Sequence, residues 1–222
     1  MPEQDFVALS AHLELVDLPR GTVVARRDER FEHVYFLESG IASVVATTPE
    51  GNQAEAGIFG FEGYVPTSAV AGVDSSTHHI SIQWDGAAYR MRYENFRIAV
   101  EKNRSLWKVI IRSIGAFSVQ LACTAICNAV HEVNERLARW LLMCHDRIHG
   151  DELPVTHDFL SMMLAVRRAS VTSALHVPEG TGFIRAERGK VIIRNRQAME
   201  EFAFDAYGIR ESGYRRLMTG LF

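Results

Sequence analysis

Two adjacent arginines, Arg167 and Arg168, stand at the start of a short segment with apolar residues at helical spacing. Val171, Ala174 and Leu175 recur at intervals of three and four residues, the pattern of an α-helix with one buried face. An arginine in the first turn of such a helix can hold O6 and N7 of a guanine with its forked guanidinium group. The spacing therefore predicts contact with duplex DNA, in which Arg168 reads a base and Arg167 contacts a phosphate or a base.

Cationic charge gathers around this segment, although the whole chain has a formal charge of −3. Residues 166–196 hold seven Lys and Arg against two Glu, whereas residues 1–100 hold 7 basic and 14 acidic side chains. Affinity for a polyanion follows local charge more closely than total charge. We therefore expect the C-terminal part of the chain to contact DNA and the acidic N-terminal part to stay away from it.

The residues around the arginines predict a helix-turn-helix. Thr156 is a good N-cap for a helix over residues 157–164, because its hydroxyl can accept a backbone N–H of the first turn. The second helix begins with the arginine pair and should end before Pro178, which lacks a backbone donor. In this motif the second helix enters the major groove and the first lies across the DNA backbone. Ser170 and Ser173 are expected to point outward and to reach phosphates or bases.

A basic hairpin follows the second helix. Residues 183–186 and 190–193 are strand-like, and a polar turn at residues 187–189 joins them. Two short helices followed by such a hairpin form a winged helix-turn-helix, in which Arg188 and Lys190 of the wing contact phosphates. The predicted DNA-binding residues lie on the two helices and the wing: Thr156, His157, Arg167, Arg168, Ala169, Ser170, Thr172, Ser173, Arg188 and Lys190.

The first hundred residues consist of short β-branched and aromatic segments separated by turns that contain Gly, Pro or Asp. Several short strands at this spacing predict an antiparallel sandwich or barrel. The predicted strands cover residues 22–25, 33–38, 41–47, 54–58, 78–83 and 87–92.

A proline-free stretch over residues 94–149 has apolar residues at helical spacing and is too long for one globular helix, so we divide it near Asn103 and near His131. Residues 114–126 carry no charge, and a helix that is apolar on more than one face must be covered on more than one side. We expect one side to pack on the β domain and another on a second copy of the chain, as a homodimer. The alternative is a buried helix of a monomer. The predicted dimer-helix residues are Leu106, Ile110, Ile114, Phe117, Leu121 and Thr124.

Composition favours a cytoplasmic protein. We find no run of about 18 apolar residues that would predict a membrane span, and residues 1–10 lack the basic start and apolar stretch of a secretory signal. Three cysteines are an odd number and too few for a disulfide framework, which fits a reducing compartment.

Several segments together resemble one known family over nearly the whole chain. The strongest lie at residues 136–142 (RLARWLL), 146–147 (DR), 156–160 (THDFL) and 163–172 (MLAVRRASVT), and weaker ones at residues 18–21, 34–40 and 60–63. They resemble the Crp/Fnr family of bacterial regulators.

The resemblance implies an α+β chain with an N-terminal jelly roll shaped like a cyclic-nucleotide-binding domain over residues 1–102. A long dimerisation helix and a connecting helix would follow over residues 103–149, and a winged helix-turn-helix over residues 150–222. It implies a homodimeric, sequence-specific transcription regulator that binds a palindromic DNA operator, with RNA polymerase as a further partner and no enzymatic activity.

The sequence departs from the family members that bind cyclic AMP. Those use a Gly-Glu pair, an arginine about ten residues later for the phosphate, and polar residues on the long helix for the base. Glu62 is present, but residues 72–80 contain no arginine, and Leu121 and Ala122 are apolar. A buried phosphate without a cation is costly to desolvate, so we expect no cyclic AMP and no cofactor. The residues assigned to the effector pocket are Gly60, Glu62, Gly63, Ser75, Ser76, Thr77, Leu121 and Ala122.

Other readings of the sequence remain open. Cys123, Cys127 and His131 repeat every four residues and could hold a metal or haem, but free cysteines are more often small core residues, and we expect the pair in the dimer seam. His33 with Glu38 resembles a metal-binding jelly roll and would suggest a metal enzyme, yet Tyr35 occupies the position of the second histidine in that pattern; we predict no metal. A further alternative is a ligand-binding or protein-interaction module with residual DNA affinity.

Overall fold

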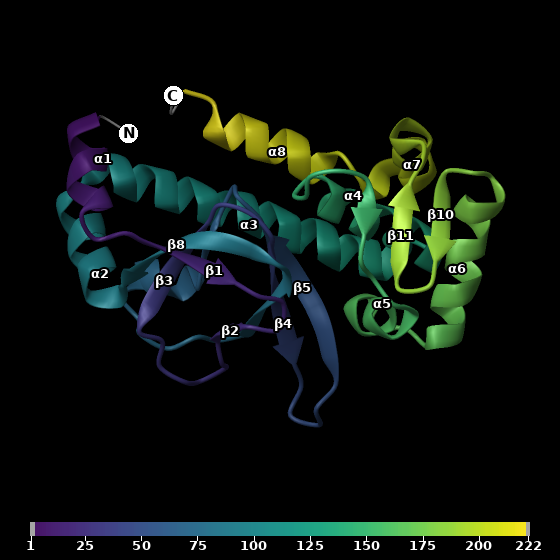
Figure 1. Cartoon of the computed structure of the whole chain (residues 1–222), viewed down its shortest axis with the longest axis horizontal. Helices are drawn as coiled ribbons and strands as arrows, with labels where there is room; N and C mark the ends of the chain where they lie inside the picture. The colour runs from purple at the N-terminus through teal and green to yellow at the C-terminus, as the bar shows by residue number, and fades with distance from the viewer. Residues whose placement is uncertain (1–2, 221–222) are drawn as a thin grey trace.

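The N-terminal half of the chain folds into two antiparallel sheets (Figure 1). The structure is a computed structural model that describes residues 3–220, except for the side chains of residues 3–5, 8 and 210. The strands of this half are β1 (Glu14–Leu18), β2 (Val23–Ala25), β3 (His33–Leu37), β4 (Ile41–Thr47), β5 (Gln53–Phe59), β6 (Tyr64–Val65), β7 (His79–Trp84) and β8 (Gly86–Arg92). They pair in the orders β1-β8-β3-β6 and β2-β7-β4-β5, and we call them together the β-roll. The predicted α+β class with an antiparallel β domain is confirmed.

Six of these strands lie at the predicted positions, and their ends agree with the prediction to within one residue. The two strands that the sequence did not predict, β1 and β6, are the edges of one sheet. An edge strand needs fewer apolar residues than a central one, and β6 has only two residues. The apolar alternation that reveals central strands is therefore weak in both.

Two glycines allow the β3–β4 and β7–β8 turns to cross. Gly40 has φ +80°, and a Cβ on Gly86 would lie 2.2 Å from the carbonyl oxygen of Ser39. No other residue fits at Gly86 without moving that backbone.

The long apolar stretch divides where the sequence predicted, at Asn103 and His131. A first helix α1 (Glu3–Ser10) and the helix α2 (Tyr93–Lys102) pack beside the start of α3 (Arg104–Val130). Asn103 ends α2 and caps α3, because its Oδ1 accepts the backbone N–H of Leu106 at 2.8 Å. A short 3₁₀ helix, η1 (Thr67–Ala71), also lies in this half.

The helix α3, 27 residues long, crosses the molecule between the β-roll on one side and a C-terminal helix, α8 (Ile209–Met218), on the other (Figure 1). Leu106, Ile110 and Phe117 are buried toward α1, α2 and the β-roll. Gly115 and Val119 lie against Leu217 and Gly213 of α8. Trp107 and Leu121 remain exposed on a third face.

Length and composition alone would allow α3 to cross a membrane, contrary to the expectation from the sequence. The helix contains few charged residues because apolar residues occupy three of its faces. A core helix covered on two sides has the same composition, so a single helix of this kind is weak evidence for a membrane span.

The C-terminal half contains short helices and a small sheet. Its elements are α4 (Val133–His145), β9 (Glu152–Leu153), α5 (His157–Leu164), α6 (Arg168–Gly180), β10 (Ile184–Glu187), β11 (Lys190–Ile193), α7 (Arg196–Ala203), the 3₁₀ helix η2 (Phe204–Ala206) and α8. The helices α5 and α6 and the strands β9 to β11 form the winged domain, which lies at the opposite end of the molecule from α1 and α2 (Figure 1).

Three details of this half differ from prediction. The helix α6 continues through Pro178 to Gly180, because a proline in the last turn removes only one hydrogen bond near the helix end. The wing has a third strand, β9, which pairs with β11. After the wing, the amphipathic spacing of residues 199–207 predicts one helix in the tail. The tail forms α7, η2 and α8 instead, with breaks at Phe204 (φ 51°) and Gly208 (φ 100°).

One buried core joins the β-roll to the C-terminal half. It includes Trp84 of the β-roll, Trp140 of α4 and Leu160 of α5. The rings of Trp84 and Trp140 lie 6.1 Å apart, and Phe159 meets both rings edge-on. The β-roll and the winged domain are therefore held against each other by aromatic packing as well as by the chain.

Candidate DNA-binding interface

The N-terminal end of α6 presents its polar side to solvent. Arg167, Arg168 and Ala169 are exposed, whereas Val171 and Leu175 are buried under the helix. Arg168 forms an ion pair with Asp158 of α5, with Nη1 and a carboxylate oxygen 3.1 Å apart. The guanidinium group is thus held at the open end of the helix by the preceding helix.

A tight turn between α5 and α6 sets the angle of the two helices. The turn contains Ala165, which has a left-handed backbone (φ 52°). Thr156 caps α5 by accepting the backbone N–H of Phe159 at 3.2 Å, as the sequence predicted. His157 Nδ1 and Thr172 Oγ1 lie 3.0 Å apart across the two helices. Two of the predicted DNA-binding residues, His157 and Thr172, are therefore brought together at the crossing of α5 and α6.

The two serines of α6 differ in position. Ser173 is exposed, and its hydroxyl donates to the carbonyl of Ala169 at 3.2 Å. Ser170 is half-buried, and both serines line a groove toward His131 and the start of α4. The expectation that both point away from the molecule is wrong for Ser170, because α4 lies alongside that face of α6.

Two of the wing cations, Arg185 and Lys190, are paired with carboxylates. Arg188 is exposed in the turn, next to Gly189, which has φ +81°. Lys190 Nζ lies 2.9 Å from Glu152 and 3.6 Å from Glu187, and the hydrogen bond from Lys190 to Glu152 raises the pKa of this lysine. The wing therefore presents less free positive charge than its cations alone suggest.

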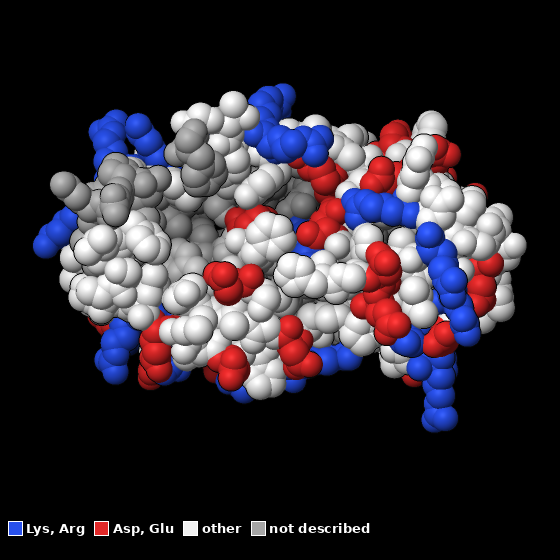
Figure 2. All heavy atoms as spheres, turned by 45° about the horizontal axis from the view of Figure 1, so that its top comes forward, with Lys and Arg blue, Asp and Glu red and all other residues white. Residues whose placement is uncertain are grey.

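Sequence reasoning missed the two carboxylates that pair with predicted DNA-binding residues, Asp158 and Glu152. Both lie just before the segment whose charge was counted, at residues 166–196, so that count could not include them. The signal in the sequence that could have revealed these pairs was their position: Asp158 lies at the start of α5, and Glu152 lies in β9. Lys and Arg side chains stand among Asp and Glu over the C-terminal part, and no single basic patch appears on the face drawn (Figure 2).

The predicted effector-pocket residues do not line one cavity. A Cβ on Gly60 would lie 2.7 Å from the side chain of Arg147, and Arg147 Nε donates to Glu62 at 2.8 Å. Gly63 packs on the ring of Phe59. Glu62, the residue expected to bind a ligand inside the β-roll, is therefore engaged by an arginine at the end of α4.

The remaining pocket residues lie elsewhere. The hydroxyl of Ser76 donates to the carbonyl of His78 at 2.7 Å, and Thr77 Oγ1 lies 2.8 Å from His78 Nδ1. Ser75 accepts a hydrogen bond from Ser68 through its carbonyl. Leu121 and Ala122 are exposed. The eight residues thus fall into separate groups, which corrects the expected pocket.

Side chains fill the space between β5 and α3. The rings of Phe59 and Phe117 stack with centroids 4.3 Å apart. Gln120 accepts the N–H of Ile58 at 2.7 Å and donates to its carbonyl at 3.0 Å. A Cβ on Gly57 would lie 2.7 Å from Gln120. A ligand at this position would have to displace a stacked aromatic pair and two buried hydrogen bonds.

Most of the predicted dimer-helix residues pack within the protomer. Leu106, Ile110 and Phe117 are buried, and Thr124 donates to the carbonyl of Gln120. Among the predicted residues, only Ile114, half-buried, and Leu121, exposed, lie on the third face of α3. Apolar residues occupy three faces of this helix, so their spacing alone does not separate residues buried within the chain from those on its open face, and the face that meets a second copy stays a prediction.

Cys123 and Cys127 are buried within the chain. The thiol of Cys127 donates to the carbonyl of Ala206 at 3.7 Å, and burial raises its pKa. His131 Nε2 lies 2.6 Å from Asp205. Among the described residues, no group of three or more His, Cys, Asp or Glu is placed to hold a metal ion.

Comparisons with known proteins agree with the two halves of this structure. A family model of the cyclic nucleotide-binding domain matches residues 15–103, and one of the Crp-like helix-turn-helix domain matches residues 135–202. None of the curated protein sequences matches the chain.

Solved structures share the fold at low sequence identity. One is the c-di-GMP-responsive global regulator CLP of Xanthomonas campestris, with 18% identity, a TM-score of 0.67, and coverage of 86% of this chain and 99% of that one. Another is FixK2 of Bradyrhizobium japonicum, with 13% identity, a TM-score of 0.68, and coverage of 86% and 96%.

A transcriptional regulator of the CRP/FNR family from Thermus thermophilus has 18% identity, a TM-score of 0.68, and coverage of 86% and 98%. A β-roll of the cyclic nucleotide-binding type, a long helix and a Crp-like helix-turn-helix therefore follow one another in this protein, and the chain belongs to the Crp/Fnr family of transcription regulators.

Proposed function

We propose that this protein is a cytoplasmic, homodimeric regulator that binds a palindromic operator in duplex DNA through α6 and the wing. The observation that carries the proposal is the exposed N-terminal end of α6. Arg167, Arg168 and Ala169 stand there free of the core, at the end of the molecule that lies away from α1 and α2 (Figure 1). A helix end presented in this way fits the major groove.

The exposed face of α3 supports the homodimer. Residues at alternating intervals of four and three lie along it, which is the heptad spacing of a two-stranded coiled coil. All are exposed except Ile114, which is half-buried, and none is among the buried core residues. The series is Trp107, Ile111, Ile114, Ser118, Leu121, Ala125 and Asn128. Since the β-roll and α8 cover the other faces, a second copy of α3 is the partner that this face fits.

We further propose that residues 1–102 receive a signal, residues 103–149 form the dimer, and residues 150–222 bind DNA, with RNA polymerase as a further partner. The filled space between β5 and α3 argues against cyclic AMP as the signal, because Phe117 and Gln120 occupy it. We assign the protein no catalytic role.

A random-oligonucleotide selection tests the DNA-binding proposal. We expect a two-fold symmetric site with half-sites about one helical turn apart. Arg168→Ala should relax base preference at one position in each half-site. Arg188→Ala should weaken all sequences alike and lower the slope of log affinity against log salt by about one.

Arg97→Ala, on α2 at the far end of the molecule, is the matched control and should change neither property. Selection without any sequence preference would contradict the proposal and favour a ligand-binding or protein-interaction module. Binding that neither Arg168→Ala nor Arg188→Ala changes would place the interface elsewhere.

A further inference from the structure

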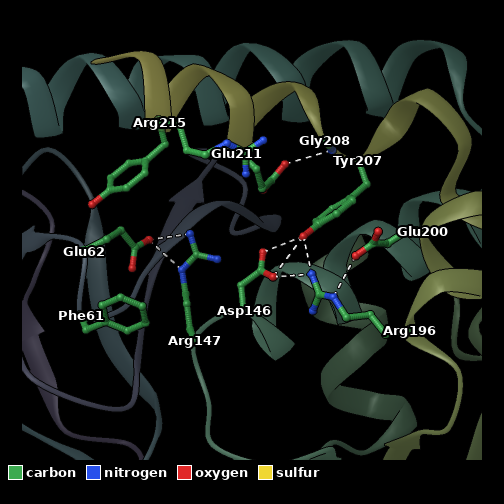
Figure 3. Close-up of a pocket in the computed structure, with 11 residues that line it drawn as sticks. Phe61, Glu62, Asp146, Arg147, Arg196, Glu200, Tyr207, Gly208, Glu211 and Arg215 are labelled. Carbon is green, nitrogen blue, oxygen red and sulfur yellow. Dashed lines mark hydrogen bonds and ion pairs between the residues drawn. The ribbon is translucent and has the colours of Figure 1, made fainter. Parts of the chain in front are cut away.

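A cavity of about 540 Å³ lies outside the β-roll, where three parts of the fold meet (Figure 3). Phe61 and Glu62 come from the β5–β6 loop, and Arg147 follows α4. Tyr214 and Arg215 come from α8. A volume of this size suits a small organic molecule, for which typical sites measure about 300–1,000 Å³.

Most charged groups in this cavity already have partners. Arg147 is buried and binds Glu62. Arg196 lies 2.6 Å from Asp146 and 2.8 Å from Glu200. Figure 3 shows these pairs on the wall of the cavity that faces α8. Because these charged groups already pair with one another, they have little capacity to bind a charged ligand.

Tyr207 and Glu211 are also engaged. The hydroxyl of Tyr207 donates to Asp146 at 3.0 Å, and burial raises the pKa of this phenol. A carboxylate oxygen of Glu211 accepts the backbone N–H of Gly208 at 2.9 Å, which caps the start of α8. Both groups therefore serve to fix the segment that leads into α8.

Arg215 differs from these groups. It lines the cavity from α8, its side chain is exposed, and among the side chains that the structure describes its guanidinium group has no hydrogen-bond or ion-pair partner. Two aromatic rings line the same cavity, those of Phe61, which is 62% exposed, and Tyr214. An unpaired guanidinium beside two rings is a combination that binds an anion with a flat apolar body.

We propose that this cavity binds a small aromatic carboxylate. Its carboxylate is held by Arg215 and its ring lies against Phe61 and Tyr214. A single negative charge matches the unpaired guanidinium of Arg215. A dianionic phosphate would meet stronger repulsion than a monoanion from the four carboxylates that line the cavity: Glu62, Asp146, Glu200 and Glu211.

The site is placed to affect the winged domain. Its walls belong to the β-roll, to the end of α4 and to α8, and α8 packs on α3. A ligand that contacts Phe61 and Arg215 together draws the β5–β6 loop toward α8. This step rests on the proposed function, because it makes the ligand a regulator of DNA binding.

Titration calorimetry on the full chain without DNA tests the site. The probes are benzoate and phenylacetate, with benzamide as the neutral comparator and phenyl phosphate as the dianionic one. We expect at least one carboxylate to bind at least tenfold more tightly than benzamide and phenyl phosphate. Arg215→Gln should weaken that binding at least tenfold, and Phe61→Ala should weaken it severalfold.

Arg216→Gln is the matched control, because Arg216 is the exposed neighbour of Arg215 on α8 and does not line the cavity. Binding by neither carboxylate, tighter binding of phenyl phosphate, or equal effects of the two arginine substitutions would overturn the proposal.

A second measurement follows DNA affinity in the presence of the carboxylate that binds. A change of at least threefold that is absent in Arg215→Gln supports regulation, and an unchanged affinity overturns it. The two proposals can fail separately. A chain that binds the carboxylate but not DNA would contradict the proposed function alone, and a chain that binds DNA but no carboxylate would contradict the site alone.

Discussion

At the scale of single residues, Glu55 links the β-roll to α4. Its carboxylate is buried and accepts hydrogen bonds from Ser43 Oγ at 2.8 Å, Gln83 Nε2 at 2.6 Å and Trp140 Nε1 at 2.7 Å. Burial is the largest influence on this group and raises its pKa above the ordinary value of 4.5. The folded protein therefore holds the proton of Glu55 more tightly than the unfolded chain does.

This difference predicts how stability depends on pH. Above the pKa of the unfolded chain, the unfolded state ionises Glu55 before the folded state does, so the free energy of unfolding falls as pH rises toward the folded pKa. The loss is about 1.4 kcal/mol for each unit by which the pKa is raised. Glu55→Gln removes the ionisation and should flatten this part of the profile.

Urea unfolding of both proteins at a series of pH values from about 4 to 7 measures the effect. Glu14→Gln is the control, since Glu14 is exposed and its hydrogen bond with Arg90 lowers the pKa of its carboxyl, so its removal should not flatten the fall. Parallel profiles for the wild type and Glu55→Gln would show that Glu55 does not carry the dependence.

The residues of the helix-turn-helix were easier to predict than those of the effector pocket. Thr156 acts as a cap and Arg168 stands at a helix start, and both properties depend on residues close in sequence. The partners of Glu62 and Phe117 come from distant segments, at Arg147 and Phe59. No local pattern in the sequence reports such contacts.

At the scale of elements, α8 fastens the C-terminus to α3. Arg112 Nη1 donates to the carbonyl of Thr219 at 3.1 Å near one end, and His131 pairs with Asp205 beyond the other. Between them a Cβ on Gly213 would lie 3.1 Å from Val119. The chain that leaves α3 at His131 thus returns to it after the winged domain, which limits how far that domain can turn about His131.

Gly213→Leu should loosen α8, because its side chain has no space against Val119. Overpacking of this kind costs about 1–3 kcal/mol. Release of the segment should expose Cys123 and Cys127, which are 7% and 3% exposed in the structure. We expect the rate of their labelling by a thiol reagent to rise at least fivefold, as followed by mass spectrometry.

Ser212→Leu places the same side chain on the exposed side of α8 and should leave the labelling rate unchanged. Equal rates in the two variants would mean that α8 does not protect these thiols. Little in the sequence pointed to this helix, since Gly213 and the few apolar residues of α8 become meaningful only against α3.

At the scale of the whole molecule, the apolar stretch in α3 serves three partners at once. The β-roll takes one face and α8 another, and the third, which contains Trp107 and Leu121, stays open. The breaks of the helix at Asn103 and His131 could be predicted because they depend on local residues. Which apolar face meets which partner could not, because each partner is assembled from distant parts of the chain.

Leu121→Glu should convert the proposed dimer to a monomer, since it places a charge opposite its own copy in the seam. Sedimentation velocity should show a species of half the mass, and affinity for a palindromic site should fall at least tenfold. Lys108→Glu, also exposed on α3 but outside the heptad series, should remain dimeric. A dimer that survives Leu121→Glu would place the subunit contact on another surface.

The aromatic packing between the β-roll and α4 has a practical consequence. The chain has three tryptophans. Trp84 and Trp140 lie 6.1 Å apart where the β-roll meets α4, and Trp107 is 44% exposed on the open face of α3. The protein therefore carries built-in fluorophores at the two places where it would change shape. With Trp107→Phe, emission reports the joint between the two halves, and with Trp84→Phe and Trp140→Phe together it reports subunit pairing, without any added dye.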